Sequence, residues 1–474
     1  MLDFGLGLTQ YVPYVAYVLW WVVAAISLVK VEIGLLFLIP LLPLQNLIDK
    51  LHVFPLGKDL VDIMLLAILV GWVVRAHTKG ERLVSRSPFN IPLLILVVLT
   101  YIGLWKGSSY LGTGMPVSTA DPRVMYWKNY MIIFLLYFMV VNNIKEKKWM
   151  VTLLILMAFT TLVLGRWFIS TYKWVKSWHF SYKQRVSLSY LGPNVIAAFF
   201  ARYLFILVPF LYYDNSKLRK GGCVLLILAM LYCILYSFTR SAYVGVLLGL
   251  IVLGLVKDKR LLVPIAALLI FWASVLPVSV VERINMTVTE EGELEPSAAG
   301  RLDIWKSCME LFKKDPLFGV GFQVIPFSGW HLTSAHNLYV TLLAESGILG
   351  LSLLLGLFAI ALRSAWRLYK RASDNFFKAL GLGVFLSVIV CMTTNFFGDH
   401  WTYIQIGAFF WALLGMTVRA NLIEEERAAK AVEAANVRGI GAVSSSGALS
   451  SAPPLDADVV AVNGAHDLTG PGAL

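Results

Sequence analysis

Long apolar runs dominate the chain and are separated by short polar segments rich in Lys and Arg. A membrane-spanning helix needs about 20 mostly apolar residues, within a range of roughly 17–25. Runs near this length predict about 12 or 13 crossings, and therefore an all-α polytopic membrane protein. The predicted spans are residues 13–29, 31–44, 60–74, 90–105, 129–142, 149–165, 193–212, 222–239, 242–256, 261–281, 337–362, 379–397 and 402–419.

Basic residues orient these spans, because cytoplasmic loops are enriched in Lys and Arg. Basic loops alternate along the chain with less basic ones, so we place the basic set in the cytoplasm. The segments between them then face the outer side, and two of these are long. The first, residues 166–192, is basic and aromatic, and the second, residues 282–336, contains a predicted short helix from about Arg301 to Lys314. The basic loops lie near residues 75–86, 145–148, 217–220, 257–260 and 363–378.

Composition supports the membrane assignment. Of the 474 residues, 58% are apolar and only 14% are charged, and the mean hydropathy is +0.74. So little charge does not cover a water-facing surface, which excludes a soluble globular enzyme, a disordered protein and a secreted disulfide scaffold. The surplus of Lys and Arg gives a net charge of +12. We interpret it first as membrane topology and expect a lipid bilayer, with no nucleic acid, as a partner.

The chain divides by character into three regions. Residues 1–190 hold the N-terminal spans and the basic outer loop, and residues 191–420 form a candidate catalytic membrane region that includes the outer loop 282–336. Residues 421–474 form a cytoplasmic tail. Its first part, 421–437, extends as a helix, and the remainder is predicted to be disordered because it has no core-forming pattern.

Arg240 is the first candidate site residue. It stands between two apolar runs with almost no loop, in Tyr236-Ser237-Phe238-Thr239-Arg240-Ser241-Ala242. One interpretation is an arginine that snorkels to the membrane edge. The topology places this turn on the outer side, where a boundary arginine is not expected. Because no acid is near in sequence, the alternative is a ligand phosphate bound by the guanidinium.

Arg301 is the second candidate, because it opens the predicted outer helix. A pairing with Asp303 is the structural interpretation. The positive end of a helix disfavours a cation but gathers an anion, and an arginine there adds donors to the backbone N–H groups.

His336 is the third candidate and begins the long apolar helix through Leu362, with Ser334 as the expected N-cap. In the first turn the helix dipole disfavours imidazolium, so His336 stays neutral near pH 7, as a general base must. The alternative is a polar residue at the membrane boundary. Glu345, nine residues on, faces away from His336 and is interpreted as structural or orienting.

The loop 166–192 has two interpretations. Its Trp and Tyr residues fit an interfacial anchor, whereas a basic outer loop also suits an anion funnel. Lys183 and Arg185 lead into the helix start at Gly192-Pro193-Asn194, whose N–H groups can face a phosphate. These three polar residues, Lys183, Arg185 and Asn194, are candidates for substrate binding. No nucleotide-binding motif or metal-spaced His and Cys cluster occurs, so we expect neither a cofactor nor a metal.

These elements together resemble the bacterial O-antigen ligase and polymerase family over about residues 190–400. Ser237 to Ala242 and Gly192-Pro193-Asn194 are similar to two further, less specific family elements. The most specific matches are Gly300-Arg301-Leu302-Asp303-Ile304-Trp305, Gly319-Val320-Gly321, His336-Asn337-Leu338-Tyr339 and Glu345-Ser346-Gly347-Ile348-Leu349-Gly350-Leu351.

The resemblance implies a membrane glycosyltransferase of the GT-C-like type in the bacterial inner membrane, with its active site facing the periplasm. Its donor would be a glycan on undecaprenyl pyrophosphate, and its acceptor lipid A-core, a glycan or a protein. Two arginines and a histidine are essential in the ligases, and they correspond here to Arg240, Arg301 and His336. A polymerase of lipid-linked repeats and a protein O-oligosaccharyltransferase remain open as alternatives, and a lipid-linked sugar transporter is an alternative of another class.

Overall fold

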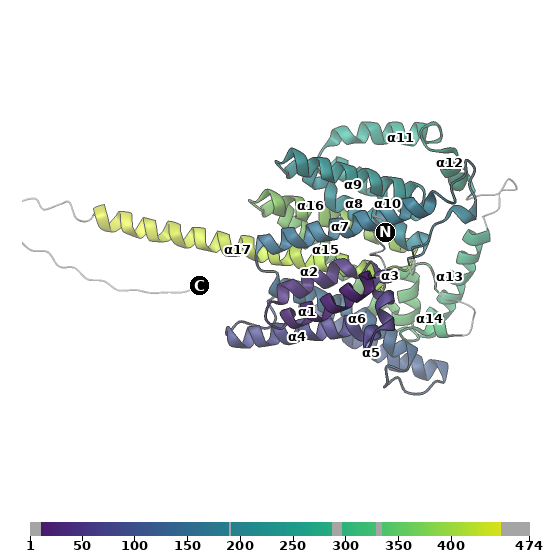
Figure 1. The fold of residues 1–474 in the computed structure, drawn as a ribbon, viewed down its shortest axis with the longest axis horizontal. Coiled ribbons are helices and arrows are strands. Elements are labelled where there is room, and N and C mark those ends of the chain that lie inside the picture. The colour runs from purple at the N-terminus through teal and green to yellow at the C-terminus, as the bar shows by residue number, and fades with distance from the viewer. Residues whose placement is uncertain (1–10, 189–190, 287–295, 329–333, 447–474) are drawn as a thin grey trace, which may run out of the picture. The chain divides into compact units, whose positions relative to one another are not determined.

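The computed structural model describes residues 11–188, 191–286, 296–328 and 334–446. These residues contain helices and one isolated β-bridge, between Leu188 and Leu191, and no β-strand. The chain divides into two units between Glu424 and Glu425, and the described part of the second unit is the end of the last helix. Figure 1 shows the helices in chain order from purple to yellow.

The elements have the following bounds. The 3-10 helices are η2 (Lys50–Val53), η3 (Gly57–Asp59), η4 (Tyr182–Gln184) and η5 (Lys259–Leu261). The α-helices are α1 (Val12–Ser27), α2 (Val31–Leu41), α3 (Gln45–Asp49), α4 (Leu60–Thr78), α5 (Asn90–Leu111), α6 (Pro122–Asn143), α7 (Lys147–Tyr172), α8 (Pro193–Tyr213), α9 (Lys217–Leu235), α10 (Arg240–Val256), α11 (Leu262–Val275), α12 (Val278–Asn285), α13 (Pro296–Lys314), α14 (Val324–Phe327), α15 (Leu338–Arg371), α16 (Asn375–Phe396) and α17 (Ile404–Ser446).

Nine helices among the described residues are long and apolar enough to cross a membrane, which confirms an all-α polytopic membrane protein. Two predicted spans are not straight. After α2 the chain bends by 103° into α3 and η2, and after α11 it bends by 102° into α12. Each bend contains a proline, Pro43 or Pro277, which lacks a backbone N–H donor. Leu276, before Pro277, is extended as the residue before a proline usually is, whereas Leu42, before Pro43, keeps helical dihedral angles.

Two further boundaries correct the sequence predictions. α7 continues to Tyr172, so Arg166 and Trp167 belong to that helix and the outer loop begins only at Lys173. α17 continues to Ser446, beyond the predicted end at residue 437. The remainder of the predicted disordered tail, residues 447–474, lies outside the described residues.

The segments that connect the helices lie at two opposite ends of them, and polar contacts show which segments share an end. One end, which we call the basic face, carries residues 79–89, 143–147, 214–217, 256–262 and 371–375. There Lys145 pairs with Glu81 at 2.5 Å and Lys147 pairs with Asp374 at 2.5 Å. The grouping agrees with the alternation of basic loops in the sequence.

The opposite end, the site face, carries residues 173–188, 236–240, 278–286, 296–328, 334–337 and 397–403. α12, α13 and α14 lie together at this end in Figure 1. Hydrogen bonds connect its segments: Leu338 N donates to Gly398 O at 3.0 Å, and Phe180 N donates to a carboxylate oxygen of Glu282 at 2.6 Å.

α8 and α16 form the centre of the helical packing. Apart from Arg202, α8 is apolar on every side, as a helix buried on all faces must be, and it is the most buried of the nine candidate spans among the described residues. α16 packs between α8 and α15. Gly381 and Gly383, about 200° apart around this helix, let the two neighbours approach closely: a side chain at Gly381 would meet the backbone of Tyr369, and one at Gly383 that of Ile206.

α15 is broken at Gly347, where φ is +63° and ψ is −162°. The break leaves backbone groups without helical partners, and the segment between α13 and α14 supplies them. Ile348 N donates to Pro316 O at 2.9 Å, and Gly321 N donates to Glu345 O at 3.0 Å. Non-helical backbone at membrane depth needs such partners, because no water is present to replace them.

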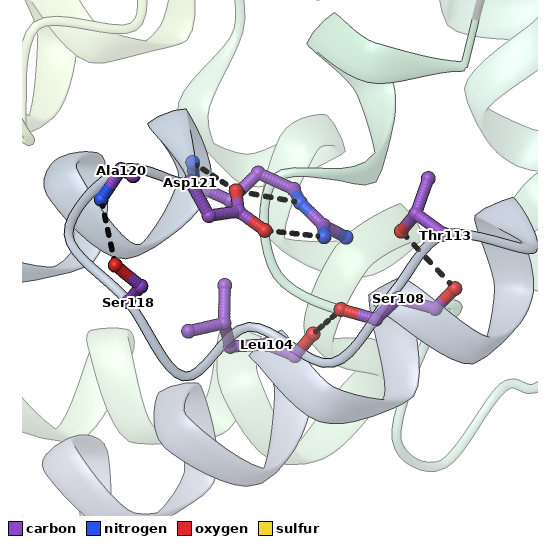
Figure 2. A network of polar contacts seen from close by, with 7 residues as sticks. Leu104, Ser108, Thr113, Ser118, Ala120 and Asp121 are labelled. Carbon is purple, nitrogen blue, oxygen red and sulfur yellow. Dashed lines mark hydrogen bonds and ion pairs between the residues drawn. The ribbon is translucent and has the colours of Figure 1, made fainter.

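The connection between α5 and α6 follows the end of α5 that pairs with the site face, where Lys106 forms an ion pair with Asp315. Figure 2 shows Asp121 at the start of α6, where its carboxylate accepts from the backbone N of Arg123 at 2.8 Å. The same carboxylate accepts from the Arg123 guanidinium at 2.8 Å. Arg123 is buried, and a buried cation needs an anionic or hydrogen-bonding partner. Asp121 therefore both caps the helix and neutralises the arginine next to it.

Substitution of Gly347 tests the break in α15. Its φ and ψ lie in a region that is essentially restricted to glycine and costs other residues about 1–3 kcal/mol, and an added Cβ would lie 2.4 Å from the backbone of Leu317. We expect Gly347→Ala to lower the thermal unfolding temperature of the purified protein by several degrees. Gly356→Ala in the same helix, where a Cβ meets nothing within 4 Å, is the matched control. Equal melting temperatures for the two variants would contradict this account.

Candidate active site

His336 does not lie in the first turn of α15, contrary to the sequence prediction. The helix begins at Leu338 and its N-cap is Asn337, whose side-chain oxygen accepts from Tyr339 N at 3.0 Å and from Val340 N at 3.2 Å. Ser334 is not the cap; its hydroxyl accepts from the backbone N of His336 at 3.0 Å. His336 has a φ of +50°. This left-handed conformation is rare for residues with a side chain and turns the imidazole out of line with the helix.

The charge state of His336 follows from its surroundings. The residue is half-buried, and burial followed by the positive charge of Arg301 lowers the pKa of its imidazole. Both effects favour the neutral ring near pH 7. The neutral form is as predicted, but its cause is burial and a neighbouring arginine rather than the end of a helix.

Arg301 lies in the second turn of α13, because that helix starts at Pro296, five residues earlier than predicted. It therefore does not stand at the helix N-terminus, and the argument from the helix dipole does not apply to it. Trp305, one turn later, donates from Nε1 to Ala335 O at 2.9 Å. This bond connects α13 to the residue before His336 and holds Arg301 near the imidazole.

Asn194 joins two other candidate segments at the start of α8. Its side-chain oxygen accepts from Arg185 Nη2 at 2.6 Å and from the Thr239 hydroxyl at 3.3 Å. Arg240 is the next residue after Thr239 and is the first residue of α10. The turn before it is strained, since Phe238 has a φ of +53°. The start of α8 and the start of α10 therefore meet, as the placement of both on one side predicts.

Arg185 connects this network to α13. Burial lowers the pKa of its guanidinium, and the charges of Arg283 and Arg301 lower it further. Arg301 therefore interacts electrostatically with both Arg185 and His336. Lys183 is exposed in η4, and among the described residues its side chain forms no hydrogen bond or ion pair with the other candidates.

Residues between α16 and α17 also belong to this region, and the sequence analysis missed them. Asp399 accepts from the Thr341 hydroxyl in α15 at 3.3 Å, and burial raises the pKa of its carboxyl to about 6. Burial, with the charges of Arg202, His336 and Arg301, lowers the pKa of His400 to about 3. The signal in the sequence was a Gly-Asp-His group between two apolar spans.

Arg202 was missed as well, although it stands in the middle of the apolar α8. Its side chain is 1% exposed, and its Nε and Nη2 donate to the Thr394 hydroxyl at 3.2 and 3.1 Å. An ionisable residue inside a span is a candidate functional residue. Its charge acts on His400, so it lies beneath the same region.

Glu345 has the structural role that was expected for it. Its side chain is buried, and its two carboxylate oxygens accept from Gln323 N and Ile325 N, each at 3.0 Å. Among the residues that the structure describes, no three His, Cys, Asp or Glu side chains group as metal ligands.

The fold and the site define a multi-pass membrane protein with a group of arginine and histidine side chains at one face. Within that class, residues 225–355 match the family model described as O-antigen ligase. The match confirms the resemblance to the O-antigen ligase and polymerase family, whose members are membrane glycosyltransferase-like enzymes. It includes Arg240, Arg301 and His336, whereas Arg185 lies before it. No curated protein matches the chain.

The influence of Arg301 on His336 can be measured by chemical modification. Diethyl pyrocarbonate reacts with neutral imidazole, so a lowered pKa keeps His336 reactive below the pH at which an ordinary histidine is protonated. We expect Arg301→Met to raise the pKa of His336 and to move the acid loss of reactivity to higher pH. Peptide mass spectrometry resolves each histidine, and the exposed His77 at the basic face is the internal control. An unchanged His336 profile would show that the charge of Arg301 does not reach the imidazole.

Proposed function

We propose that the protein transfers a glycan from undecaprenyl pyrophosphate to an acceptor hydroxyl, in the manner of an O-antigen ligase. The reaction takes place at the periplasmic face of the bacterial inner membrane and serves lipopolysaccharide or polysaccharide biosynthesis. The observation that carries the proposal is the bond from the Trp305 indole to Ala335 O at 2.9 Å, which connects the helix of Arg301 to the residue before His336. It joins the two segments of the matched family region that carry Arg301 and His336.

The two family arginines act on the leaving group. When the bond between the anomeric carbon and the pyrophosphate oxygen breaks, the pyrophosphate leaves with the electron pair and gains negative charge. Arg240 and Arg301 bind this group and stabilise the charge in the transition state. One well-placed donor of this kind is worth about 3 kcal/mol, or roughly 10²–10³ in rate. Two guanidinium groups supply the positive charge that a metal ion supplies in other transferases, so the proposed reaction is metal-independent.

His336 acts on the acceptor. Its neutral imidazole takes the proton of the acceptor hydroxyl as that oxygen forms a bond to the anomeric carbon. General base catalysis of this kind typically contributes roughly 10²–10⁴ in rate. Attack and departure occur in one step on opposite faces of the carbon, so the configuration of the anomeric carbon is inverted.

The other predicted residues bind the donor. Arg185 binds a phosphate oxygen, and Asn194 orients it through the 2.6 Å bond to Nη2. The exposed Lys183 attracts the anionic headgroup toward the site, since long-range attraction does not need a fixed contact.

The acceptor decides between three activities that share this donor chemistry. With lipid A-core as the acceptor the protein is a ligase, with another lipid-linked repeat it is a polymerase, and with a protein hydroxyl it is an O-oligosaccharyltransferase. All three need the same base and the same arginines, so residue chemistry at the donor site does not separate them.

A carrier for anionic lipid-linked sugars is the second candidate, and Arg202 is the observation that favours it. A transport path needs charges deep within the spans, and Arg202 is such a charge. A carrier has no effect in detergent, where no sealed compartment exists, whereas a transferase still makes product there.

The first test of the proposed function is an assay of the purified protein with a lipid-linked glycan and candidate acceptors. We expect a discrete shifted product with the correct acceptor, whereas a ladder from donor alone identifies a polymerase. The product should carry the inverted anomeric configuration by NMR, EDTA should have no effect, and His336→Ala should lower turnover by roughly 10²–10⁴. His77→Ala, at the basic face, is the matched control. Substantial turnover by His336→Ala would remove it as the base, and retained configuration would refute single-step attack.

Replacement of Arg240 by lysine tests whether a planar guanidinium is needed. A lysine keeps the charge but does not give the two parallel donors that bind phosphate, so we expect Arg240→Lys to lose most of its activity. Arg219→Lys, an exposed residue paired with Asp214 at the basic face, is the matched control and should keep full activity. Near-normal turnover by Arg240→Lys would count against phosphate binding at this position.

A further inference from the structure

Arg283 is a buried arginine at the site face that the proposed reaction has not used. It lies in α12 with 4% of its surface exposed. Its guanidinium lies 5.2 Å from the ring centre of Phe180 and 5.5 Å from that of Tyr182. Both rings belong to residues 173–185, which we call the aromatic strap. Aromatic faces attract a cation and fix the plane of a guanidinium, whose N–H donors point outward in that plane.

The residue before Arg283 fastens the strap to α12. The Glu282 carboxylate contacts His179 Nδ1 at 2.5 Å through one oxygen and accepts from Phe180 N at 2.6 Å through the other. The Phe180 ring also packs against Phe238, with 5.0 Å between ring centres. Both oxygens of Glu282 are therefore engaged with the strap, and the strap holds the rings beneath the Arg283 guanidinium.

The strap ends at Arg185, whose backbone N donates to Tyr182 O at 3.2 Å, so both arginines lie next to Tyr182. The charge of Arg283 lowers the pKa of Arg185, and Arg301 has the same effect. Tyr243 of α10 lies within electrostatic range of Arg185 and Arg283 as well. Arg185 Nη2 binds Asn194, but its buried Nε has no hydrogen-bond partner among the described residues. Two guanidinium groups beside one aromatic residue, with a buried donor of Arg185 left without a partner in the described part of the chain, suit an anionic ligand.

We propose that Arg283 is a third donor-site arginine and that, together with Arg185, it forms a subsite that makes the protein select a diphosphate over a monophosphate. The inference rests on the proposed function for the identity of the donor. Arg301 links the two parts of the site, since its charge acts on His336 and on Arg185. Arg301 then serves the phosphate next to the sugar, and the Arg185–Arg283 pair holds the phosphate next to the lipid.

In this inference Arg283 determines which ligand binds, and it does not only support the strap. A support would contribute through its contacts with Phe180 and Tyr182, and its loss would lower stability whatever the ligand. A phosphate-binding residue changes the affinity for a diphosphate more than that for a monophosphate, because only the diphosphate reaches both parts of the site. The two roles therefore differ in a measurable ratio.

Binding of inorganic pyrophosphate and of inorganic phosphate to the purified full-length protein tests this ratio. The shift in melting temperature with ligand concentration gives the apparent dissociation constants. We expect the wild type to bind pyrophosphate more tightly than phosphate. Arg283→Met keeps the apolar stem and should weaken pyrophosphate binding roughly ten- to a hundredfold, with little change for phosphate. Lys176→Met, an exposed charge in the same strap, should keep the wild-type preference.

Two further variants keep the test decisive if Arg283→Met is poorly folded. Arg283→Lys keeps the charge but not the planar donors and should also lose the preference for pyrophosphate. Phe180→Leu loosens the strap without removing a charge and should lower the ligand-free melting temperature more than it changes the preference. A wild-type preference in Arg283→Met or Arg283→Lys would overturn the inference, as would a wild type that binds both anions equally.

The donor assay separates this inference from the proposed function. If the wild type transfers glycan while Arg283→Met keeps the Michaelis constant for the lipid-linked donor, the inference fails and the proposed function stands. If pyrophosphate binding depends on Arg283 but the wild type transfers no glycan from any lipid-linked donor, the proposed function fails and the diphosphate subsite stands.

Discussion

The site face depends on the hydrogen bonds that the Glu345 carboxylate accepts. It lies within a helix that is long enough to span a membrane, two residues before the break at Gly347, and it accepts from two backbone N–H groups of the segment between α13 and α14. The backbone carbonyls of residues 344 and 345 accept from the same segment. Inside a membrane an unpartnered carboxylate or a broken helix is costly. Here the segment between α13 and α14 supplies hydrogen-bond partners to both the carboxylate and the broken helix. These bonds also fix the end of α13, the helix that carries Arg301.

The positively charged part of the site differs, because its three arginines repel one another and, having only donors, do not bond to one another. Arg185, Arg283 and Arg301 come from a loop and two helices, and their charges oppose one another. Asn194 binds Arg185, aromatic rings lie against Arg283, and the Trp305 indole ties the helix of Arg301 to Ala335.

Much of this could be predicted from the sequence, and the exceptions have physical causes. Apolar runs locate the helices because length and hydropathy are local properties, and Arg240, Arg301 and His336 stand out as polar residues next to such runs. The cap of α15 was misassigned because Ser334 and Asn337 are both good caps, and only the left-handed backbone of His336 decides between them. Arg283 could not be found, since the strap that meets α12 is distant in the chain: His179 and Glu282 are 103 residues apart.

The segment that matches the family model is not a separable module. α10, at its start, packs against α8 and α16, and α15, at its end, packs against α5 and α16, all of which lie outside residues 225–355. Excision of the matched stretch would expose those interfaces. It would also remove Asn194, the strap, and Asp399, which accepts a hydrogen bond from Thr341. Chimaeras that exchange only the matched stretch would therefore break these interfaces.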